Sequence, residues 1–497
     1  MSEPSTDDNR SKAEILDVVI IGAGLSGIDA AYRLREENPN LRYRIIERRA
    51  RVGGTWDLFT YPGIRSDSDI YTLSFPFEPW RRPEALAQGA DIRRYVEDTA
   101  HREGIASQIS FGEHVRAVDW DSTSDTWTIT SSTEGAVGAA TMTTHRCRFV
   151  YFATGYYNYD SPYTPRFAGV DDYRGAVVHP QHWPADLDYA GQRVVVIGSG
   201  ATAVSMIPAL ARTAGHVTML QRSPSYIASM SQRQRINPVI RKLLPANAAH
   251  RVIRTRYAAQ TAALVHALHR FPKVGRKVLT AGVARELPDG YPVDVHFSPT
   301  YNPWDQRMCM VPDGDLFAEI SSGRVEMVTD HIDHFDATGI ALTSGRHLDA
   351  DLVVTATGLQ LQAFGGIRLS MDGAEIKPHD RFMFKSHLLE DVPNFAWSVG
   401  YTNASWTLRA DMTARAVATL LRYMRSEGYT HAYPHLGAVS MASTPLWDLQ
   451  AGYVQRAPEA LPKAGTTGKW RVRHNYYRDA IDHRFDDVTE SMVFGRT

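Results

Sequence analysis

The chain has 497 residues, of which 43% are hydrophobic and 22% charged, and this ordinary globular mixture excludes disordered, collagen-like and coiled-coil proteins. Its 54 basic and 55 acidic residues leave a net charge of −1, so no overall field attracts nucleic acid. The only two cysteines, Cys147 and Cys309, exclude a disulfide scaffold and a four-cysteine metal site, and they fit a reducing cytoplasm.

The N-terminus shows no targeting signal. Residues 1–13 are polar and acidic, and we expect a loose tail rather than a signal peptide. Residues 194–211 form the longest stretch without charge or histidine, which is long enough to span a membrane. A Gly-Ser-Gly sequence divides this stretch, so we expect no transmembrane segment.

The first structural motif is a glycine-rich turn after an apolar run. Residues 18–21 predict a parallel strand buried on both faces, and Gly22, Gly24 and Gly27 follow in GxGxxG spacing before an expected helix. Glu47 ends the next predicted strand, 25 residues after Gly22, where a carboxylate can accept both ribose hydroxyls. Strand, turn, helix and acid together predict a dinucleotide site with the phosphates at the helix N-terminus.

A second motif of the same kind begins at residue 193. Gly198 and Gly200 follow another apolar run, and Gln221 takes the place that Glu47 has in the first motif. Arg222 comes next, and its guanidinium can bind the 2′-phosphate that an acid would repel. The second site therefore favours NADPH, although Arg222 is also open to interpretation as a solvated surface residue.

Two dinucleotide sites in one chain imply hydride transfer between cofactors, with FAD expected in the first site. Further strands are expected at 113–120, 126–131 and 149–154, with a loop of small polar residues at 132–145. Residues 149–155 and 351–358 both end in Ala-Thr-Gly, which indicates that the chain leaves one sheet near 155 and returns to it near 358.

The predicted fold class is therefore α/β, with two Rossmann-like dinucleotide-binding domains, the second inserted into the first. The expected boundaries are 14–158 for the first part of the FAD domain, 159–349 for the NADPH domain with a helical insertion at about 231–285, and 350–497 for the second part of the FAD domain and the C-terminal segment.

Two longer patterns point to a family. Residues 53–67, Gly-Gly-Thr-Trp-Asp-Leu-Phe-Thr-Tyr-Pro-Gly-Ile-Arg-Ser-Asp, resemble the GGxWxxxxYPGxxxD signature of type I Baeyer–Villiger monooxygenases. Residues 173–184 resemble that family's FxGxxxHxxxWP signature, with Tyr173 in place of phenylalanine. The resemblance covers nearly the whole chain. Within the flavin-containing monooxygenase superfamily, the stretches 301–307 and 400–406 look most like the mycobacterial ethionamide-activating type.

The resemblance implies an FAD- and NADPH-dependent enzyme that inserts one atom of O₂ into ketones to give esters or lactones through a C4a-peroxyflavin, with S-oxygenation as a side activity. Arg307 resembles the family's essential arginine, whose permanent charge can hold a peroxide anion. Asp67 resembles its carboxylate partner. An ion pair on a loop remains an alternative for Arg307, as does a helix N-cap for Asp67.

The motifs and the resemblance together place a set of residues at the cofactors. They are Gly22, Gly24, Ser26, Gly27, Glu47, Arg48, Gly54, Thr55, Trp56, Asp67, Tyr71 and Val115 for FAD, and Gly198, Ser199, Gly200, Ala201, Thr202 and Arg222 for NADPH. Trp56 and Tyr61 are equally interpretable as core aromatics. His179 is expected to be structural or part of a hinge. No metal site is predicted, because Pro434 separates His431 from His435 and disfavours a shared helical face.

Residues 231–285 contain 12 Arg and Lys and no Asp or Glu. We expect this stretch to pack in the NADPH domain with solvated charges, while peripheral membrane attachment and nucleic-acid binding stay open as alternatives. The predicted partners are a small-molecule ketone or sulfide and O₂, without nucleic acid. The predicted location is cytoplasmic, with peripheral membrane contact through this stretch left open.

Three other functions remain open from the sequence. One is a flavin monooxygenase that oxygenates sulfur or nitrogen and rarely ketones. Another is a non-catalytic, membrane-associated flavoprotein that senses NADPH. The third is an NADPH oxidase that releases peroxide. The Asp67 signature and Arg307 favour ketone oxidation over the first of these.

Overall fold

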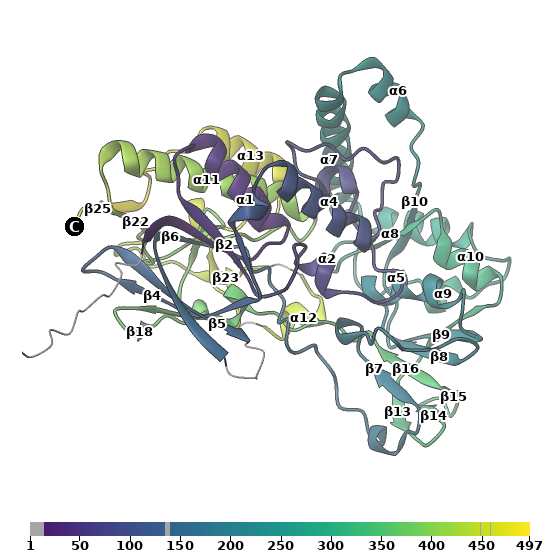
Figure 1. The fold of residues 1–497 in the computed structure, drawn as a ribbon. Helices are drawn as coiled ribbons and strands as arrows, with labels where there is room; N and C mark the ends of the chain where they lie inside the picture. Colours follow the sequence, from purple (N-terminus) through teal and green to yellow (C-terminus); the bar gives the residue numbers. More distant parts are fainter. Residues whose placement is uncertain (1–13, 135–139, 448, 458) are drawn as a thin grey trace, which may run out of the picture.

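The computed structural model describes residues 14–134, 140–447, 449–457 and 459–497, so the predicted tail at 1–13 lies outside the described residues. Two lobes lie side by side, each built around a sheet (Figure 1). The first sheet runs in the order β18 (Ala374–Glu375), β17 (Arg368–Met371), β4 (Glu113–Asp121), β5 (Thr126–Glu134), β6 (Ala140–Phe152), β1 (Ile15–Ile21), β2 (Tyr43–Glu47) and β3 (Ile109–Phe111), and β21 (Phe395–Trp397) also pairs with β6.

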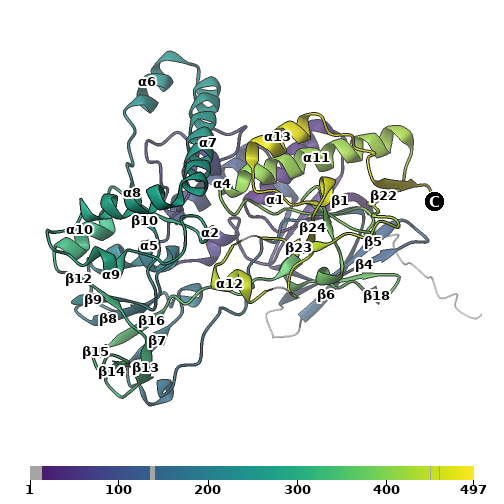
Figure 2. The same ribbon diagram turned by 180° about the vertical axis from the view of Figure 1, so that it is seen from behind.

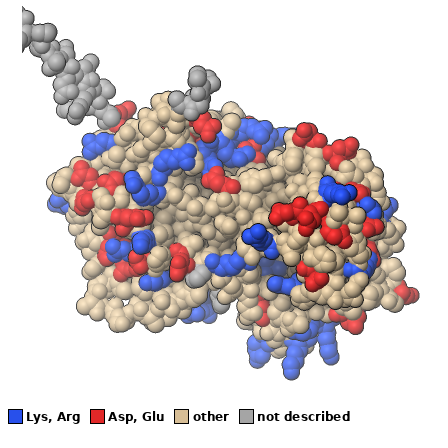
Figure 3. Space-filling model, turned by 90° about the horizontal axis from the view of Figure 1, so that it is seen from below, with Lys and Arg blue, Asp and Glu red and all other residues tan. Residues whose placement is uncertain are grey.

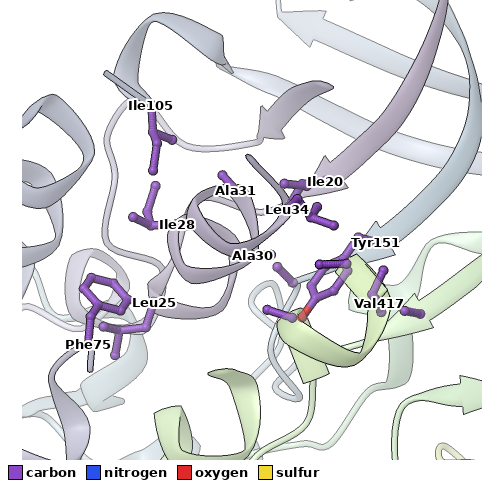
Figure 4. Packing of buried hydrophobic residues seen from close by; sticks show 14 of the residues in the cluster. Ile20, Leu25, Ile28, Ala30, Ala31, Leu34, Phe75, Ile105, Tyr151 and Val417 are labelled. Atoms are coloured by element: carbon purple, nitrogen blue, oxygen red, sulfur yellow. The ribbon is translucent and has the colours of Figure 1, made fainter. Parts of the chain in front are cut away.

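The core of the first lobe forms where β1 lies parallel to β2 and β6. Helix α1 (Leu25–Glu37) packs against α11 (Trp406–Glu427), although almost 400 residues separate them in the chain. Figure 4 shows Ile20 of β1, Leu34 of α1 and Val417 of α11 around Tyr151 of β6, and all four are fully buried. Burial of these apolar side chains joins the two ends of the chain into one lobe.

The second sheet is parallel throughout, in the order β12 (Val325–Thr329), β9 (His216–Gln221), β8 (Arg193–Ile197), β16 (Leu352–Thr355) and β7 (Ala176–Val178). Around it lie α5 (Ala201–Leu210), α9 (Val293–His296), α10 (Asp315–Ser321) and a small antiparallel sheet of β13 (Ile332–Phe335), β14 (Gly339–Leu342) and β15 (His347–Asp349). Two sheets with a glycine turn in each confirm the predicted fold class.

The domain boundary expected at residue 350 is too early. β16 is hydrogen-bonded between β8 and β7, so the second sheet extends to Thr355, and the chain rejoins the first sheet at β17, which pairs with β4. The two Ala-Thr-Gly sequences therefore end one strand in each sheet. The sequence could not assign β16 to a sheet, because its apolar run suits the centre of either one.

The loop expected at 132–145 is largely a hairpin instead. β5 continues to Glu134 and β6 begins at Ala140, and the two strands pair in an antiparallel register. The threonines of this stretch explain the error, because threonine is polar in a hydropathy pattern yet, as a β-branched residue, favours a strand. Residues 135–139 lie outside the described residues.

Three helices occupy the predicted insertion: α6 (Ile236–Leu243), α7 (Ala246–Arg270) and α8 (Pro272–Ala284). α6 and the adjoining part of α7 project from the body of the protein in both ribbon views (Figures 1 and 2). None of the helices in the described part of the chain is long and apolar enough to cross a membrane. Over most of the face shown in Figure 3, basic and acidic side chains are interspersed, while a group of basic side chains lies at its lower edge.

The remaining elements connect the lobes and complete the C-terminal region. They are α2 (Thr55–Leu58), α3 (Ile70–Leu73), α4 (Gly89–Arg102), β10 (Ile227–Met230), β11 (Cys309–Pro312), β19 (Met383–Phe384), β20 (Leu388–Leu389), β22 (His431–Pro434), β23 (Ser443–Pro445), α12 (Gly452–Gln455), β24 (Lys463–Gly465), α13 (Tyr476–Arg484) and β25 (Met492–Gly495).

Candidate functional site

A cavity of about 880 Å³ is lined by both glycine turns, by the segment 53–68 and by residues of the C-terminal segment around α12. A smaller pocket of about 60 Å³ shares Gly24 and Gly54 with it and extends toward the end of β2. Most of the residues predicted for the two cofactors therefore lie around one continuous space.

The first glycine turn is shaped for a close approach of backbone to a ligand. A Cβ on Gly27 would lie 1.9 Å from the carbonyl oxygen of Gly22, so only glycine lets α1 pack this tightly against the turn. Gly24 is the N-cap of α1, and no side chain caps the helix there. The free N–H groups of this end fit the phosphates of a dinucleotide.

Glu47 closes the same turn from the end of β2. The buried carboxylate accepts hydrogen bonds from the N–H groups of Ala23 (2.7 Å) and Arg49 (2.8 Å), and burial raises its pKa. A carboxylate has about four acceptor positions, so two remain for ribose hydroxyls. Glu47 lines the smaller pocket together with Arg48 and Val115.

The second glycine turn repeats this geometry. A Cβ on Gly198 would lie 2.4 Å from the carbonyl oxygen of Ala356, just as a Cβ on Gly22 would lie 2.6 Å from that of Ala153. Each Ala-Thr-Gly sequence therefore packs against the first glycine of the turn in the same lobe. This packing explains why the sequence motif occurs twice. Gly200 is the uncapped N-cap of α5, and the predicted residues Ser199, Ala201 and Thr202 line the cavity with it.

Arg222 and Gln221 point in different directions at the end of β9. The Gln221 side chain is buried and donates to the carbonyl oxygen of His296 (2.8 Å) and to the hydroxyl of Thr329 (2.9 Å). Arg222 is exposed and lines the cavity. Of these two neighbours, it is the arginine that can reach a 2′-phosphate.

Arg307 and Asp67 meet in the cavity. The guanidinium donates from Nε to Asp67 Oδ2 (2.8 Å) and from Nη2 to Oδ1 (2.9 Å), and Nη2 also donates to the Ser68 hydroxyl (3.0 Å). The Asp67 carboxylate raises the pKa of Arg307 further above its usual range, so the cation is permanent. The Arg307 side chain is still 34% exposed, so it can contact a ligand in the cavity.

Asp67 is not the N-cap of a helix, because Asp69 occupies that position. Asp69 precedes α3 and accepts the N–H of Thr72 (2.8 Å). Asp67 is therefore free to pair with Arg307, which lies just before β11.

An aromatic wall that the sequence did not predict as part of the site stands beside this ion pair. Tyr156 stacks on Trp406 with ring centres 4.8 Å apart, and Trp406 Nε1 donates to the hydroxyl of Ser26 (2.8 Å). The hydroxyls of Tyr156 and Tyr157 are hydrogen-bonded to each other, and Tyr453 of α12 also lines the cavity. Burial raises the pKa of Tyr156, so its hydroxyl stays protonated.

Thr55 and Trp56 of α2 line the cavity as expected, and Tyr61 lines it while its hydroxyl lies 3.3 Å from Ser205 Oγ in α5. The expected flavin contact of Tyr71 needs correction. Its ring is fully buried against Tyr257 of α7, its hydroxyl donates to the Pro83 carbonyl (3.0 Å), and it is not part of the cavity lining. Tyr71 follows the signature by four residues, but α3 turns its side chain toward the helical insertion.

His179 has the contacts of a structural residue. Its Nδ1 accepts the N–H of Gln181 (3.1 Å), and burial lowers its pKa to about 4. His431 and His435 hydrogen-bond to Asp125 and Asp391 respectively. Within the described ranges, no group of three or more His, Cys, Asp or Glu could hold a metal ion.

Comparison with known proteins places this chain in a family. Residues 19–272 match the model of the pyridine nucleotide-disulphide oxidoreductase family. The chain is 47% identical over 467 residues to the FAD-containing monooxygenase EthA of Mycobacterium tuberculosis, covering 94% of each chain. It is 46% identical to the putative FAD-containing monooxygenase MymA of the same species, over 96% of this chain and 97% of that one. The probable FAD-binding monooxygenase AlmA of Acinetobacter baylyi is 43% identical over 95% of both.

Solved structures agree in fold. An oxidized steroid monooxygenase bound to NADP superimposes with a TM-score of 0.73 at 21% identity, over 97% of this chain and 100% of the other. Cyclohexanone monooxygenase from Rhodococcus sp. Phi1, bound to NADP⁺, gives 0.73 at 18% identity, over 98% and 100%. Cys147 and Cys309 are both buried and free here, so this chain has no cysteine pair for disulphide chemistry.

Proposed function

This chain belongs to the family of FAD-containing monooxygenases, and we propose that it is an NADPH-dependent Baeyer–Villiger monooxygenase. It inserts one atom of O₂ beside the carbonyl of a ketone and releases an ester or lactone, with oxygenation of sulfides at the same site as a side reaction. The observation that carries this proposal is the Arg307–Asp67 pair, held in a cavity between two dinucleotide turns.

Each glycine turn belongs to the binding site of one cofactor. Gly22, Gly24 and Glu47 would hold FAD, with Trp56 available to its ring, and the N-terminus of α5 and Arg222 would hold NADPH. When bound, these cofactors supply the hydride and the activation of oxygen. The protein supplies placement and charge.

Arg307 acts as a fixed cation for the negative charge that develops during oxygen transfer. A permanently protonated guanidinium stabilises an anion without transferring a proton to it. Asp67 positions the guanidinium through two parallel hydrogen bonds. The wall of Tyr156, Trp406 and Tyr453 keeps water away and favours an apolar substrate.

The test is the variant Arg307→Ala. We expect ester formation from ketones to fall by about 100-fold to 1,000-fold, the usual cost of removing one charge-stabilising donor, while NADPH still reduces the flavin. Stopped-flow absorbance of the flavin and chromatography of the products measure the two steps separately.

A matched control is Arg346→Ala, which removes an arginine from a surface ion pair with Glu326. Both steps should be unchanged in that variant. Normal ester formation by Arg307→Ala would contradict the proposed role of Arg307.

A further inference from the structure

Helix α6 presents its apolar side to solvent. Ile236, Val239 and Leu243 recur at helical spacing and are 49%, 54% and 74% exposed. The polar Asn237 lies on the protein side, 3% exposed, and accepts a hydrogen bond from Arg256 Nη2 (2.6 Å). A surface helix of a globular protein normally has the opposite orientation, with its apolar stripe toward the core.

The projection formed by α6 and α7, residues 236–270, is a fixed arm rather than a loose segment. Arg254 of α7 is buried and donates from Nη1 to the carbonyl oxygens of Tyr71 (3.0 Å), Thr72 (2.8 Å) and Ser74 (2.6 Å). Arg241 of α6 donates to three more carbonyls, those of Trp80, Arg81 and Arg82. These hydrogen bonds hold α6 and α7 in a fixed position where α6 projects from the body of the protein (Figures 1 and 2).

The charged residues of the segment that carries the stripe all have one sign. Residues 231–285 contain 12 Arg and Lys and no acid, and eight of these basic residues are exposed: Arg233, Arg235, Lys242, Arg251, Arg270, Lys273, Lys277 and Arg285. Among the ion pairs of the described residues, only Arg233 of this stretch contacts an acid, Glu84 at 3.4 Å.

Basic residues beside an exposed apolar stripe match the chemistry of an anionic bilayer surface. The headgroups take the positive charges, and the boundary with the acyl chains takes the apolar side chains. Nucleic acid would use the charges alone and leave Val239 and Leu243 in water. A second copy of this arm would bring its own positive charges close to those of the first.

We propose that α6 attaches the protein peripherally to anionic membranes. Val239 and Leu243 enter the region below the headgroups, and Arg235 and Lys242 contact the lipid phosphates. The apolar side of α6 is then buried in lipid instead of water.

Flotation of the full-length, FAD-loaded protein with vesicles tests this proposal. We expect binding to vesicles of phosphatidylcholine with phosphatidylglycerol, and little binding to phosphatidylcholine alone. The double variant Val239→Ser/Leu243→Ser should bind at least about tenfold more weakly, because several buried methylene groups are lost. Lys242→Gln should weaken binding about fivefold, and added salt should weaken it further.

The control is Val295→Ser/Val439→Ser, which alters two residues outside the arm that are 48% and 62% exposed. It should bind as the unchanged protein does, and NADPH oxidation should be the same in all variants. Absence of binding, or equal binding by Val239→Ser/Leu243→Ser, would overturn the proposal. So would a dimer in solution that this double variant dissociates, because a second copy would then cover α6.

Discussion

Arg307 and Asp67 lie 240 residues apart in sequence, yet two hydrogen bonds join them in the cavity. The family resemblance predicted both residues and their pairing, but their hydrogen-bond geometry needed the fold, because no local pattern links the segment before β11 to the segment before α3. Tyr156 and Trp406 were missed as site residues for a related reason. An aromatic residue after a buried strand, as Tyr156, or at the start of a helix, as Trp406, looks the same in a sequence whether it faces a core or a cavity.

At Arg222, we predict that Arg222→Gln raises the KM for NADPH by about 10-fold to 100-fold, the range expected when a charged hydrogen bond is lost. The KM for NADH should change little, because NADH has no 2′-phosphate to meet the guanidinium. Steady-state kinetics with both cofactors provide the comparison. Arg212→Gln, at another exposed arginine of the same lobe, is the control. An equal rise in the KM for NADPH and for NADH would show that Arg222 does not contact the 2′-phosphate.

At the scale of elements, the glycine turns were predictable because their spacing is fixed by backbone geometry that only glycine permits. β1, β2, β8 and β9 were located in this way from the motifs alone. The sheet that receives β16 was not predictable, since parallel neighbours are chosen by long-range packing. The threonine-rich hairpin of β5 and β6 was not predicted for a different reason: its strands lack apolar periodicity.

The contact between residues 61–63 and helix α5 offers a test at this scale. A Cβ on Gly63 would lie 2.3 Å from the carbonyl oxygen of Ser205, whereas a Cβ on Gly345 meets no atom within 4 Å. The two glycines have similar backbone angles, with φ of +81° and +87°. Gly63→Ala should therefore destabilise the protein by about 1–3 kcal/mol more than Gly345→Ala does, through overpacking alone. Chemical denaturation measures the difference, and equal losses would mean that this contact is not tightly packed.

For the molecule as a whole, the fold keeps several histidines buried and neutral. Burial lowers the pKa of His387 to about 4, and the pKa values of His250 and His474 fall to about 4 and about 3 for the same reason. Between the unfolded pKa of 6.5 and these folded values, the unfolded state binds more protons than the folded state does. Stability should therefore fall as the pH decreases from about 6.5 to 4.

His387→Gln isolates one of these groups. The full shift at His387 corresponds to roughly 3 kcal/mol, so the variant should lose stability less steeply than the unchanged protein over this pH range. The free energy of unfolding, measured at several pH values, provides the slope. His334→Gln, at a site 51% exposed, is the comparison variant. If His387→Gln leaves the slope of stability against pH unchanged, His387 binds its proton in the folded state as readily as in the unfolded state.

The most direct test of ketone oxygenation is product analysis with ¹⁸O₂. The purified protein with FAD and NADPH would be incubated with methyl ketones, cyclic ketones and sulfides, and the products identified by mass spectrometry. Esters or lactones that carry one ¹⁸O atom are the predicted result. NADPH consumption that yields only sulfoxide or hydrogen peroxide would contradict ketone oxygenation and indicate a heteroatom oxygenase or an oxidase.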